Sequence, residues 1–381
     1  MAKLGMPTVV VKFIEAGIEA IQRSQRGIVA LILEDTKQVI DKLATKTNGH
    51  EVLPNPFLVY TVDDIPEELS DKNKDYILKA LKGYNKPPLK VVVYMMQQGG
   101  DKAGADRFQE PLKAMLTERF DYLAIPTIET AQLEYVATWV KTARENKFKK
   151  IKVVLPGSNA DYEGVINFGN TKVVTADREY KAAEYTARIA GLVAGTNMTQ
   201  SATYAPLTEV IDCDRHTQDE MDTMVNEGKF FIWYDGEKFK MSRAMNSLVT
   251  TSQGKLEGYQ TIKIVDIMDM IYDDIRKTAQ DSYIGKYTND YENKCLLISA
   301  ILGYFKQLEN ERLLQKDYST CEIDCEAVRT YQLSHGLFTK EELAKMSDDE
   351  VKKLDTKKIV FLKAKVRPLD AMEDIQLPIS I

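Results

Sequence analysis

The chain has 381 residues, enough for one large or two modest domains that each bury a core. Its 51 lysines and arginines against 57 aspartates and glutamates give a net charge of −6, which argues against nucleic acid as the main partner. Hydrophobic residues make up 44% of the chain and charged residues 28%, a composition typical of a folded globular protein and unlike that of a disordered one.

Apolar, strand-like runs dominate the first half of the chain. Residues Thr8–Ile14 are mostly β-branched or apolar and follow a Gly-Met-Pro breaker, so we expect a strand there. Between residues 28 and 195, short apolar runs alternate with helical stretches. The predicted strands in this region are Ile28–Leu33, Phe57–Tyr60, Leu89–Met95, Tyr122–Ile125, Ile151–Leu155, Val165–Phe168 and Val173–Thr175.

Helical windows lie between and after these strands. Apolar residues at helical spacing predict a helix over residues 70–83, a second from near Thr130, and a third capped by Asp177 that ends near Gly195. Continuous apolar strands that alternate with helices are typical of a mostly parallel sheet covered on both faces. We therefore expect residues 23–245 to form an α/β core with a mixed, mostly parallel sheet and flanking helices.

The C-terminal half has a different pattern. Residues 229–240 read as a β-hairpin around an Asp-Gly turn, the strongest short hairpin signal. Two long amphipathic helices follow, the second capped at Asn289, and then a short helix from Thr339 and a strand at Ile359–Val366. We expect residues 246–366 to form an α+β region built on the two long helices.

The last seven residues alternate apolar and polar side chains to the end of the chain. A period of two indicates a strand with one buried face, and burying each aliphatic side chain would contribute roughly 1.5–3 kcal/mol. A free end normally frays, because nothing offsets the entropy lost on ordering it. The aliphatic side chains of this predicted strand are Ile375, Leu377, Ile379 and Ile381.

Strand-like segments at both ends leave two arrangements open. Each segment can pair within its own chain, or it can add to the sheet of another copy, which would make the protein the subunit of a polymer. In the second arrangement the segments beside the end strands would serve as hinges. On the C-terminal side these hinge residues are Arg367, Pro368 and Asp370.

A phosphate-binding or nucleophilic site is weakly supported by the sequence. The turn Gly99–Asp106 follows a strand, as a phosphate loop would, but its final glycine is followed by Ala105 and Asp106, and an aspartate would repel phosphate. Ser158 would need a histidine as its base. The three histidines, His50, His216 and His335, lie in no triad-like context.

The sequence supports a metal or redox site equally weakly. On a strand, Asp212, Asp214 and His216 would point the same way as ligands, but a fourth ligand is not evident. Cys321 and Cys325 fit neither a redox motif nor a zinc knuckle. We therefore predict no catalytic residue, metal or cofactor. The alternative kept open is a cytoplasmic α/β enzyme or nucleotide-binding protein.

Four acids lie on the first long helix opposite its apolar stripe. Such a face is usually solvated, although in an assembling protein it can pair with basic residues of a neighbouring copy. These acids are Asp266, Asp269, Asp273 and Asp274.

Cysteine content and hydropathy favour a cytoplasm as the place of synthesis. Four cysteines in a chain of this length indicate a reducing compartment. The residues before Pro7 contain no apolar signal-peptide region, and residues 189–208 lack charges but turn polar from Thr196 onward. We expect no membrane anchoring.

Several stretches after residue 190 follow one known pattern in order and spacing. They are Ala190–Thr196, Ser201–Tyr204, Asn246–Thr250, Lys263–Ile271, Asp274–Arg276, Tyr283–Lys286 and Asp370–Glu373. In these stretches the chain resembles the contractile tail sheath proteins of myovirus-type phages, especially the short sheaths of PBSX-like prophages and R-type bacteriocins. The N-terminal α/β part resembles this family more loosely, and the charged stretch 335–358 departs from it.

The resemblance implies a structural subunit that polymerises helically, in stacked rings of about six, around an inner tail tube and contracts to drive that tube through an envelope. It implies baseplate and tail terminator proteins as further partners, and a virion tail or bacteriocin particle as the location. It also implies that an N-terminal arm, residues 1–22, and a C-terminal arm, residues 367–381, exchange strands between subunits. The N-terminal strand would present Val9, Val11 and Phe13. The tube-facing candidates are Lys286, Lys306 and Arg312.

Overall fold

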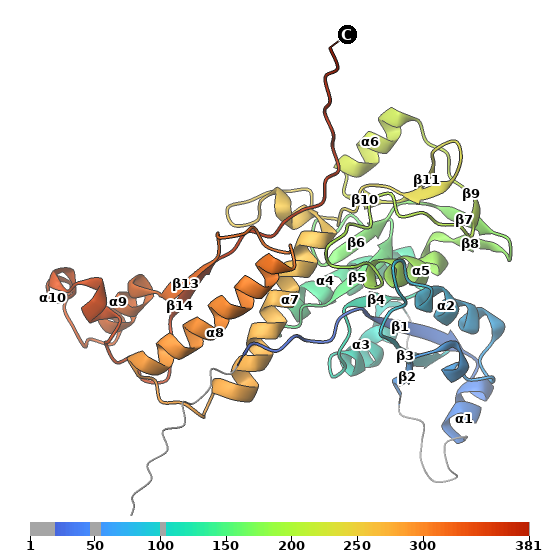
Figure 1. The fold of residues 1–381 in the computed structure, drawn as a ribbon. Coiled ribbons are helices and arrows are strands. Elements are labelled where there is room, and N and C mark those ends of the chain that lie inside the picture. Colours follow the sequence, from blue (N-terminus) through green and yellow to red (C-terminus); the bar gives the residue numbers. More distant parts are fainter. Residues whose placement is uncertain (1–19, 46–54, 100–103, 381) are drawn as a thin grey trace, which may run out of the picture. The chain divides into compact units, whose positions relative to one another are not determined.

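The computed structural model describes residues 20–45, 55–99 and 104–380, which form two compact units (Figure 1). The sheet unit comprises residues 23–273 and 368–380, and the helix unit comprises residues 20–22 and 274–367. The chain passes between them at 22/23, inside a helix at 273/274, and at 367/368. The sequence analysis placed its divisions at 22/23, 245/246 and 366/367, and that division into four parts stays a prediction.

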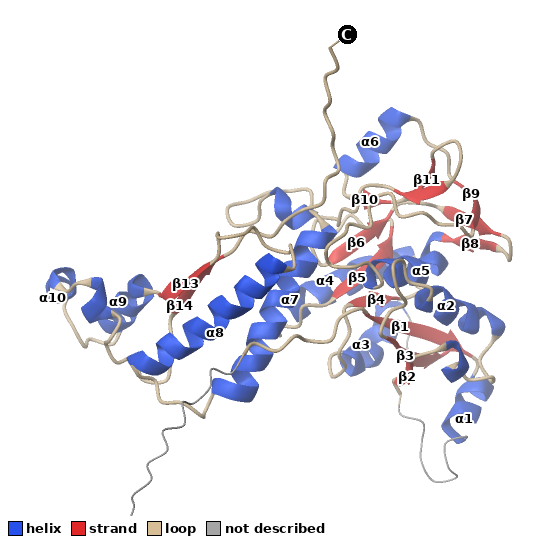
Figure 2. Ribbon diagram, in the orientation of Figure 1, coloured by secondary structure: helices blue, strands red, loops and turns tan. Residues whose placement is uncertain are grey.

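A seven-stranded sheet forms the centre of the sheet unit (Figure 2). The strand order is β10-β6-β5-β4-β1-β3-β2, and every neighbouring pair is parallel except β2 with β3. The strands are β1 (Ile28–Asp35), β2 (Phe57–Val59), β3 (Lys90–Gln97), β4 (Tyr122–Ala124), β5 (Lys152–Pro156), β6 (Val165–Phe168) and β10 (Lys229–Phe230). The predicted mixed, mostly parallel sheet is confirmed.

Helices cover both faces of this sheet, as expected for strands that are apolar on both sides. Along β1, Val29 and Leu31 pack in the cluster that contains α2 (Asp71–Leu81) and α5 (Ala182–Ala194), together with Leu43 of α1 (Lys37–Thr45). The alternate residues Ile28 and Ala30 pack in a second cluster, with α3 (Gln109–Met115) and α4 (Leu133–Glu145).

Two smaller sheets complete the sheet unit. The last predicted strand of the core is β7 (Lys172–Thr175), which lies between β8 (Glu179–Lys181) and β9 (Val210–Cys213) in an antiparallel sheet. The predicted hairpin is confirmed as β11 (Ile232–Tyr234) paired with β12 (Phe239–Met241), while β10 joins the large sheet instead. Helix α6 (Gln218–Asn226), capped by Thr217, precedes the hairpin.

The helix unit holds the end of α7 (Ile262–Thr278) and all of α8 (Tyr291–Asn310), the two predicted long helices. A small apolar cluster joins α9 (Cys325–Ser334) and α11 (Asp348–Val351) to an antiparallel strand pair, β13 (Thr320–Ile323) with β14 (Leu362–Lys365). The charged stretch also contains α10 (Lys340–Lys345), which Thr339 caps as predicted.

Three predicted boundaries are wrong for local reasons. Strand β8 intervenes after Asp177, so Lys181 occupies the N-terminus of α5 and its N–H donates to Glu184. Asp290, not Asn289, caps α8 by accepting the Asn293 N–H at 2.8 Å. The Asn289 amide donates instead to the carbonyls of residues 357 and 359, and this turn delays the closing strand until Leu362.

Candidate assembly site at the C-terminal segment

The C-terminal segment is an unpaired strand candidate. Residues 369–380 form no helix or strand, and Figure 1 draws them as an extended trace. The apolar side chains of Ile375, Leu377 and Ile379 are 83%, 74% and 77% exposed. Against the described part of its own chain, the stretch 375–380 therefore has no buried apolar face. Ile381 and the N-terminal strand residues Val9, Val11 and Phe13 lie outside the described residues.

The predicted hinge lies between two held positions. On the helix-unit side, the carbonyl of Arg367 accepts the Gln315 N–H at 2.8 Å, and its guanidinium lies over the Tyr318 ring. Asp370 is solvent-exposed and accepts its neighbour's N–H, that of Ala371. On the sheet-unit side, Glu373 is largely buried and bonded to the sheet unit. The predicted hinge residues Arg367, Pro368 and Asp370 thus begin at the last residue of the helix unit and continue into the sheet unit.

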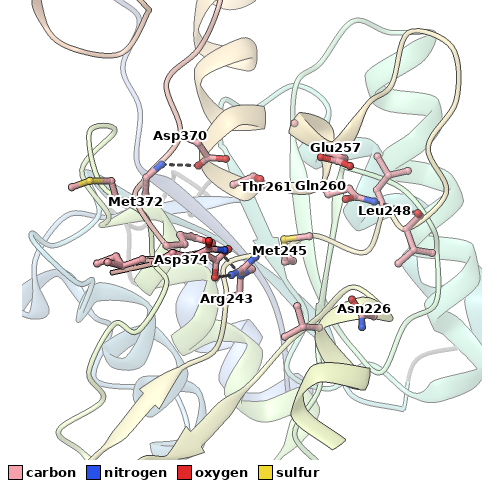
Figure 3. A pocket seen from close by; sticks show the side chains of 17 residues that line it. Asn226, Arg243, Met245, Leu248, Glu257, Gln260, Thr261, Asp370, Met372 and Asp374 are labelled. Carbon is pink, nitrogen blue, oxygen red and sulfur yellow. Dashed lines mark hydrogen bonds and ion pairs between the residues drawn. The ribbon is translucent and has the colours of Figure 1, made fainter. Parts of the chain in front are cut away.

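A groove runs beside this segment in the sheet unit (Figure 3). Its volume is about 1130 Å³, and residues 370–376 form one wall. Val225 at the end of α6 and the loop carrying Met245, Leu248 and Glu257 contribute to the rest of the lining. Residues 370–374, the root of the C-terminal segment, therefore form part of the groove wall.

The four acids of α7 are not solvated, and that expectation is wrong. Both oxygens of Asp269 accept from the Arg144 guanidinium at 2.9 Å, and Oδ2 also accepts from Lys152 Nζ at 2.7 Å. Asp269 is 3% exposed. Burial by itself would raise the pKa of Asp269, but Lys152 and Arg144 outweigh it and hold this pKa at about 2.

The other three acids of α7 also form hydrogen bonds or ion pairs within the chain. Asp266 accepts from the Tyr122 hydroxyl and from Lys152. Asp273 pairs with Arg26 at 2.9 Å, and Asp274 accepts from the Tyr304 hydroxyl at 2.7 Å. Periodicity identified the polar face correctly but gave no sign that α4, β4 and β5 cover it with cations and a tyrosine.

Comparison with known proteins identifies the family. The family model of the phage tail sheath protein central domain matches residues 101–247, and the model of the phage tail sheath C-terminal domain matches residues 255–381. The tail sheath protein of Clostridium phage phiCD119 is 32% identical to the chain, and the alignment covers 99% of both sequences. The chain belongs to the phage tail sheath protein family.

One further relative and one solved structure are also similar to the chain. The phage-like element PBSX protein XkdK of Bacillus subtilis is 29% identical over 47% of this chain and 40% of its own length. The helical sheath of the anti-feeding prophage in the contracted state shares the fold, with a TM-score of 0.68, 12% identity and 99% of both chains covered. The resemblance predicted from the sequence is confirmed, and the enzyme alternative has no support.

The structure does not assemble the weak chemical candidates into a site. Asp214 accepts from the Thr171 N–H and hydroxyl, Asp212 pairs with Arg215, and the His216 ring packs against Phe231. Among residues 20–45, 55–99 and 104–380, no cluster of three metal-ligating side chains occurs. Residues 100–103, half of the turn Gly99–Asp106, lie outside the described residues.

The proposed tube-facing cations of this sheath protein bond within the helix unit. Lys306 pairs with both Glu309 and Asp317, the Lys286 ammonium donates to the Asp281 carbonyl, and Arg312 stands in a turn at φ +59°. Their role at a tube remains a prediction. No helix in the described part of the chain is both long and apolar enough to cross a membrane.

The sequence analysis missed the side chains that hold the root of the C-terminal segment. They are Ser201, Thr203 and Arg243, which bond to Glu373. Two of the family-matched stretches, Ser201–Tyr204 and Asp370–Glu373, meet at this point. The sequence marked both stretches but gave no sign that they meet.

Proposed function

We propose that the chain polymerises as a contractile sheath, in which each copy lends its C-terminal arm as a strand to a neighbouring copy. The arm spans residues 367–381, and residues 1–22 serve as a second arm. The observation that carries the proposal is the alternating segment 375–380, whose apolar side chains are 74–83% exposed in the single chain. A strand with an apolar face and no partner is a template for strand addition.

The pair β13–β14 of a neighbouring copy is the acceptor that fits best. A two-stranded sheet is marginally stable alone and gains from a third strand. Cys321 and Ile323 of β13 are buried while Thr320 and Glu322 are exposed, so the sheet has one apolar face. Residues 363–365 of β14 are exposed. An added arm with the same alternation would extend the apolar face over the small cluster of the helix unit.

Proline in the arm is compatible with strand addition. Pro378 has no N–H, so it is tolerated only where that position faces away from the ladder, as on an edge strand. The arm would then occupy the edge of the enlarged sheet or pair on one side at that position.

The sheath would act on an inner tail tube without a cofactor. Stored energy would be the difference between two packings of rigid subunits, and the arms would keep the subunits linked while the lattice changes. The fold shared with a contracted helical sheath supports helical self-assembly. In this proposal the rings hold about six copies, tube, baseplate and terminator proteins are the partners, and assembly takes place in the bacterial host cytoplasm.

Negative-stain electron microscopy of the purified protein tests the proposal. The full chain should form helical tubes, and a variant lacking residues 377–381 should stay folded but form none. Ile379→Asp should also prevent tubes, because it places a charge on the buried face of the added strand. Ser380→Asp adds the same charge on the opposite face and should be tolerated.

The outcomes separate strand exchange from a role in folding. Both side chains are exposed in the single chain, so neither aspartate variant should change the stability of the monomer. Loss of the folded monomer on deletion of residues 377–381 would mean that the segment belongs to its own core. Tubes formed equally well by both aspartate variants would also rule out the proposed pairing.

A further inference from the structure

The root of the C-terminal arm is held by one largely buried carboxylate. Oε1 of Glu373 accepts from the Thr203 hydroxyl at 2.6 Å and from the Ser201 hydroxyl at 3.2 Å. Its other oxygen lies 3.3 Å from Nε of Arg243, and the Glu373 side chain is 15% exposed. The same guanidinium also bonds to Asp374. The Thr203 hydrogen bond has the short distance of a charge-assisted bond, which is stronger than a neutral one.

The groups that hold Glu373 are themselves fixed in the sheet unit. The Thr203 hydroxyl oxygen accepts the Ala244 N–H at 2.9 Å and lies 2.8 Å from the Ser201 hydroxyl, while its own hydrogen is donated to the carboxylate. The Ser201 hydroxyl oxygen accepts the Thr203 N–H at 3.1 Å. The cradle therefore presents oriented donors before the carboxylate arrives, and little freedom is lost when Glu373 binds.

A second cation faces the same acids. Lys263, on the first turn of α7, is 6% exposed. Burial lowers the pKa of Lys263, and the carboxylates of Asp370 and Glu373 act in the opposite direction. Arg243 and Lys263 thus provide positive charge near the acidic residues 370, 373 and 374 of the arm root.

After Glu373 the arm makes few contacts with the rest of the sheet unit. The Asp374 side chain is 76% exposed, and the next apolar residue, Ile375, is 83% exposed. We propose that the cradle of Ser201, Thr203 and Arg243 clamps Glu373 and sets the pivot of the arm after Asp374, so that only residues 375–381 swing to a neighbouring copy. This proposal rests on the strand-exchange function proposed above.

The position of the pivot decides how far the arm can reach. Seven extended residues span at most about 25 Å, whereas an arm free from Pro368 onward would span about 50 Å. A clamped root therefore limits the arm to an adjacent copy and fixes its register there. Glu373 acts as a positioning residue, because it would not itself touch the acceptor strand.

Backbone ¹⁵N relaxation of the unassembled full chain tests the clamp, under conditions in which sedimentation finds single copies. In the unchanged protein, residues 371–374 should have order parameters near 0.85, and residues 375–380 should fall below about 0.6. In Glu373→Ala, residues 371–374 should also fall below about 0.6. Met372→Ala removes a neighbouring side chain that is 93% exposed and should leave the profile unchanged.

Two results would overturn the inference. One is mobility of residues 371–374 in the unchanged protein, and the other is an unchanged profile in Glu373→Ala. Urea unfolding monitored by tryptophan fluorescence should show that Glu373→Ala leaves the sheet unit folded. The proposed function is tested separately by tube formation, so tubes without a clamp, or a clamp without tubes, would identify which of the two proposals fails.

Discussion

Asp269 offers the sharpest test of how α7 is attached to the sheet unit. Asparagine at this position keeps the shape of the side chain but removes the charge that faces Arg144 and Lys152. Lys152 retains Asp266 at 2.9 Å, whereas Arg144 would keep only neutral acceptors, the Ile151 carbonyl and the asparagine amide oxygen. The Arg144 side chain is 5% exposed, and its Nε already lacks a partner. The substitution therefore leaves a buried cation without its counter-ion.

Two independent routes give the expected magnitude. Removing one partner of a buried ion pair costs about 3–5 kcal/mol. The pKa of Asp269, lowered from 3.8 to about 2, implies that its charge contributes about 2 kcal/mol at neutral pH. We therefore expect Asp269→Asn to lower the free energy of unfolding of the sheet unit by about 2–5 kcal/mol.

Urea unfolding monitored by tryptophan fluorescence measures this change directly. Both tryptophans, Trp139 and Trp233, lie in the sheet unit. Asp266→Asn should cost less than Asp269→Asn, because Lys152 keeps Asp269 and the Tyr122 hydroxyl still finds an amide oxygen. A loss below about 1 kcal/mol for Asp269→Asn would refute the view that this network is a buried attachment.

Three further predictions follow from particular contacts. Gly191→Ala should destabilise the sheet unit by about 1–3 kcal/mol or more, because its Cβ would collide with the α2 backbone, whereas Gly303→Ala meets open space and should be neutral or stabilising. Acid should weaken the fold as pH falls from about 5 to 2, since Asp269 and Glu209 both have pKa values lowered to about 2; a flat unfolding profile there would contradict this. Leu377→Ala should raise the critical concentration for tubes roughly tenfold or more, measured by sedimentation, and an unchanged value would exclude its burial on assembly.

The core strands were predictable because they are continuous apolar runs. Each of β1 to β7 falls at a predicted run, and the central strands β1 and β3 to β6 are largely apolar because helices cover both faces of the sheet. Lys152, the first residue of β5, is the informative exception: it is 1% exposed, and a lysine in an apolar strand needs a buried counter-ion. The periodicity of α7 could not reveal that counter-ion, because apolar spacing marks one face of a helix and says nothing of what covers the other.

The sequence predicted that the C-terminal segment is strand-like but could not predict which strand it pairs with. Alternation from Ile375 onward indicates a strand, and the structure leaves its apolar side chains exposed. A single sequence contains no signal for a partner strand that belongs to another copy. The cradle around Glu373 was missed for a related reason, since Ser201 and Arg243 lie 130 to 172 positions away in sequence and only the fold brings them to the arm root.

An exposed apolar strand is also an aggregation hazard, and the magnitudes indicate how this chain limits it. Burying Ile375, Leu377 and Ile379 contributes roughly 1.5–3 kcal/mol each, while ordering the backbone of each of the five residues 375–379 costs roughly 1–2 kcal/mol of entropy. The two totals nearly cancel, so one arm meeting one acceptor binds weakly. A lattice in which every copy both donates and accepts arms turns later contacts into intramolecular ones. Weak single pairing together with a clamped root therefore favours cooperative assembly of a regular sheath over indiscriminate association.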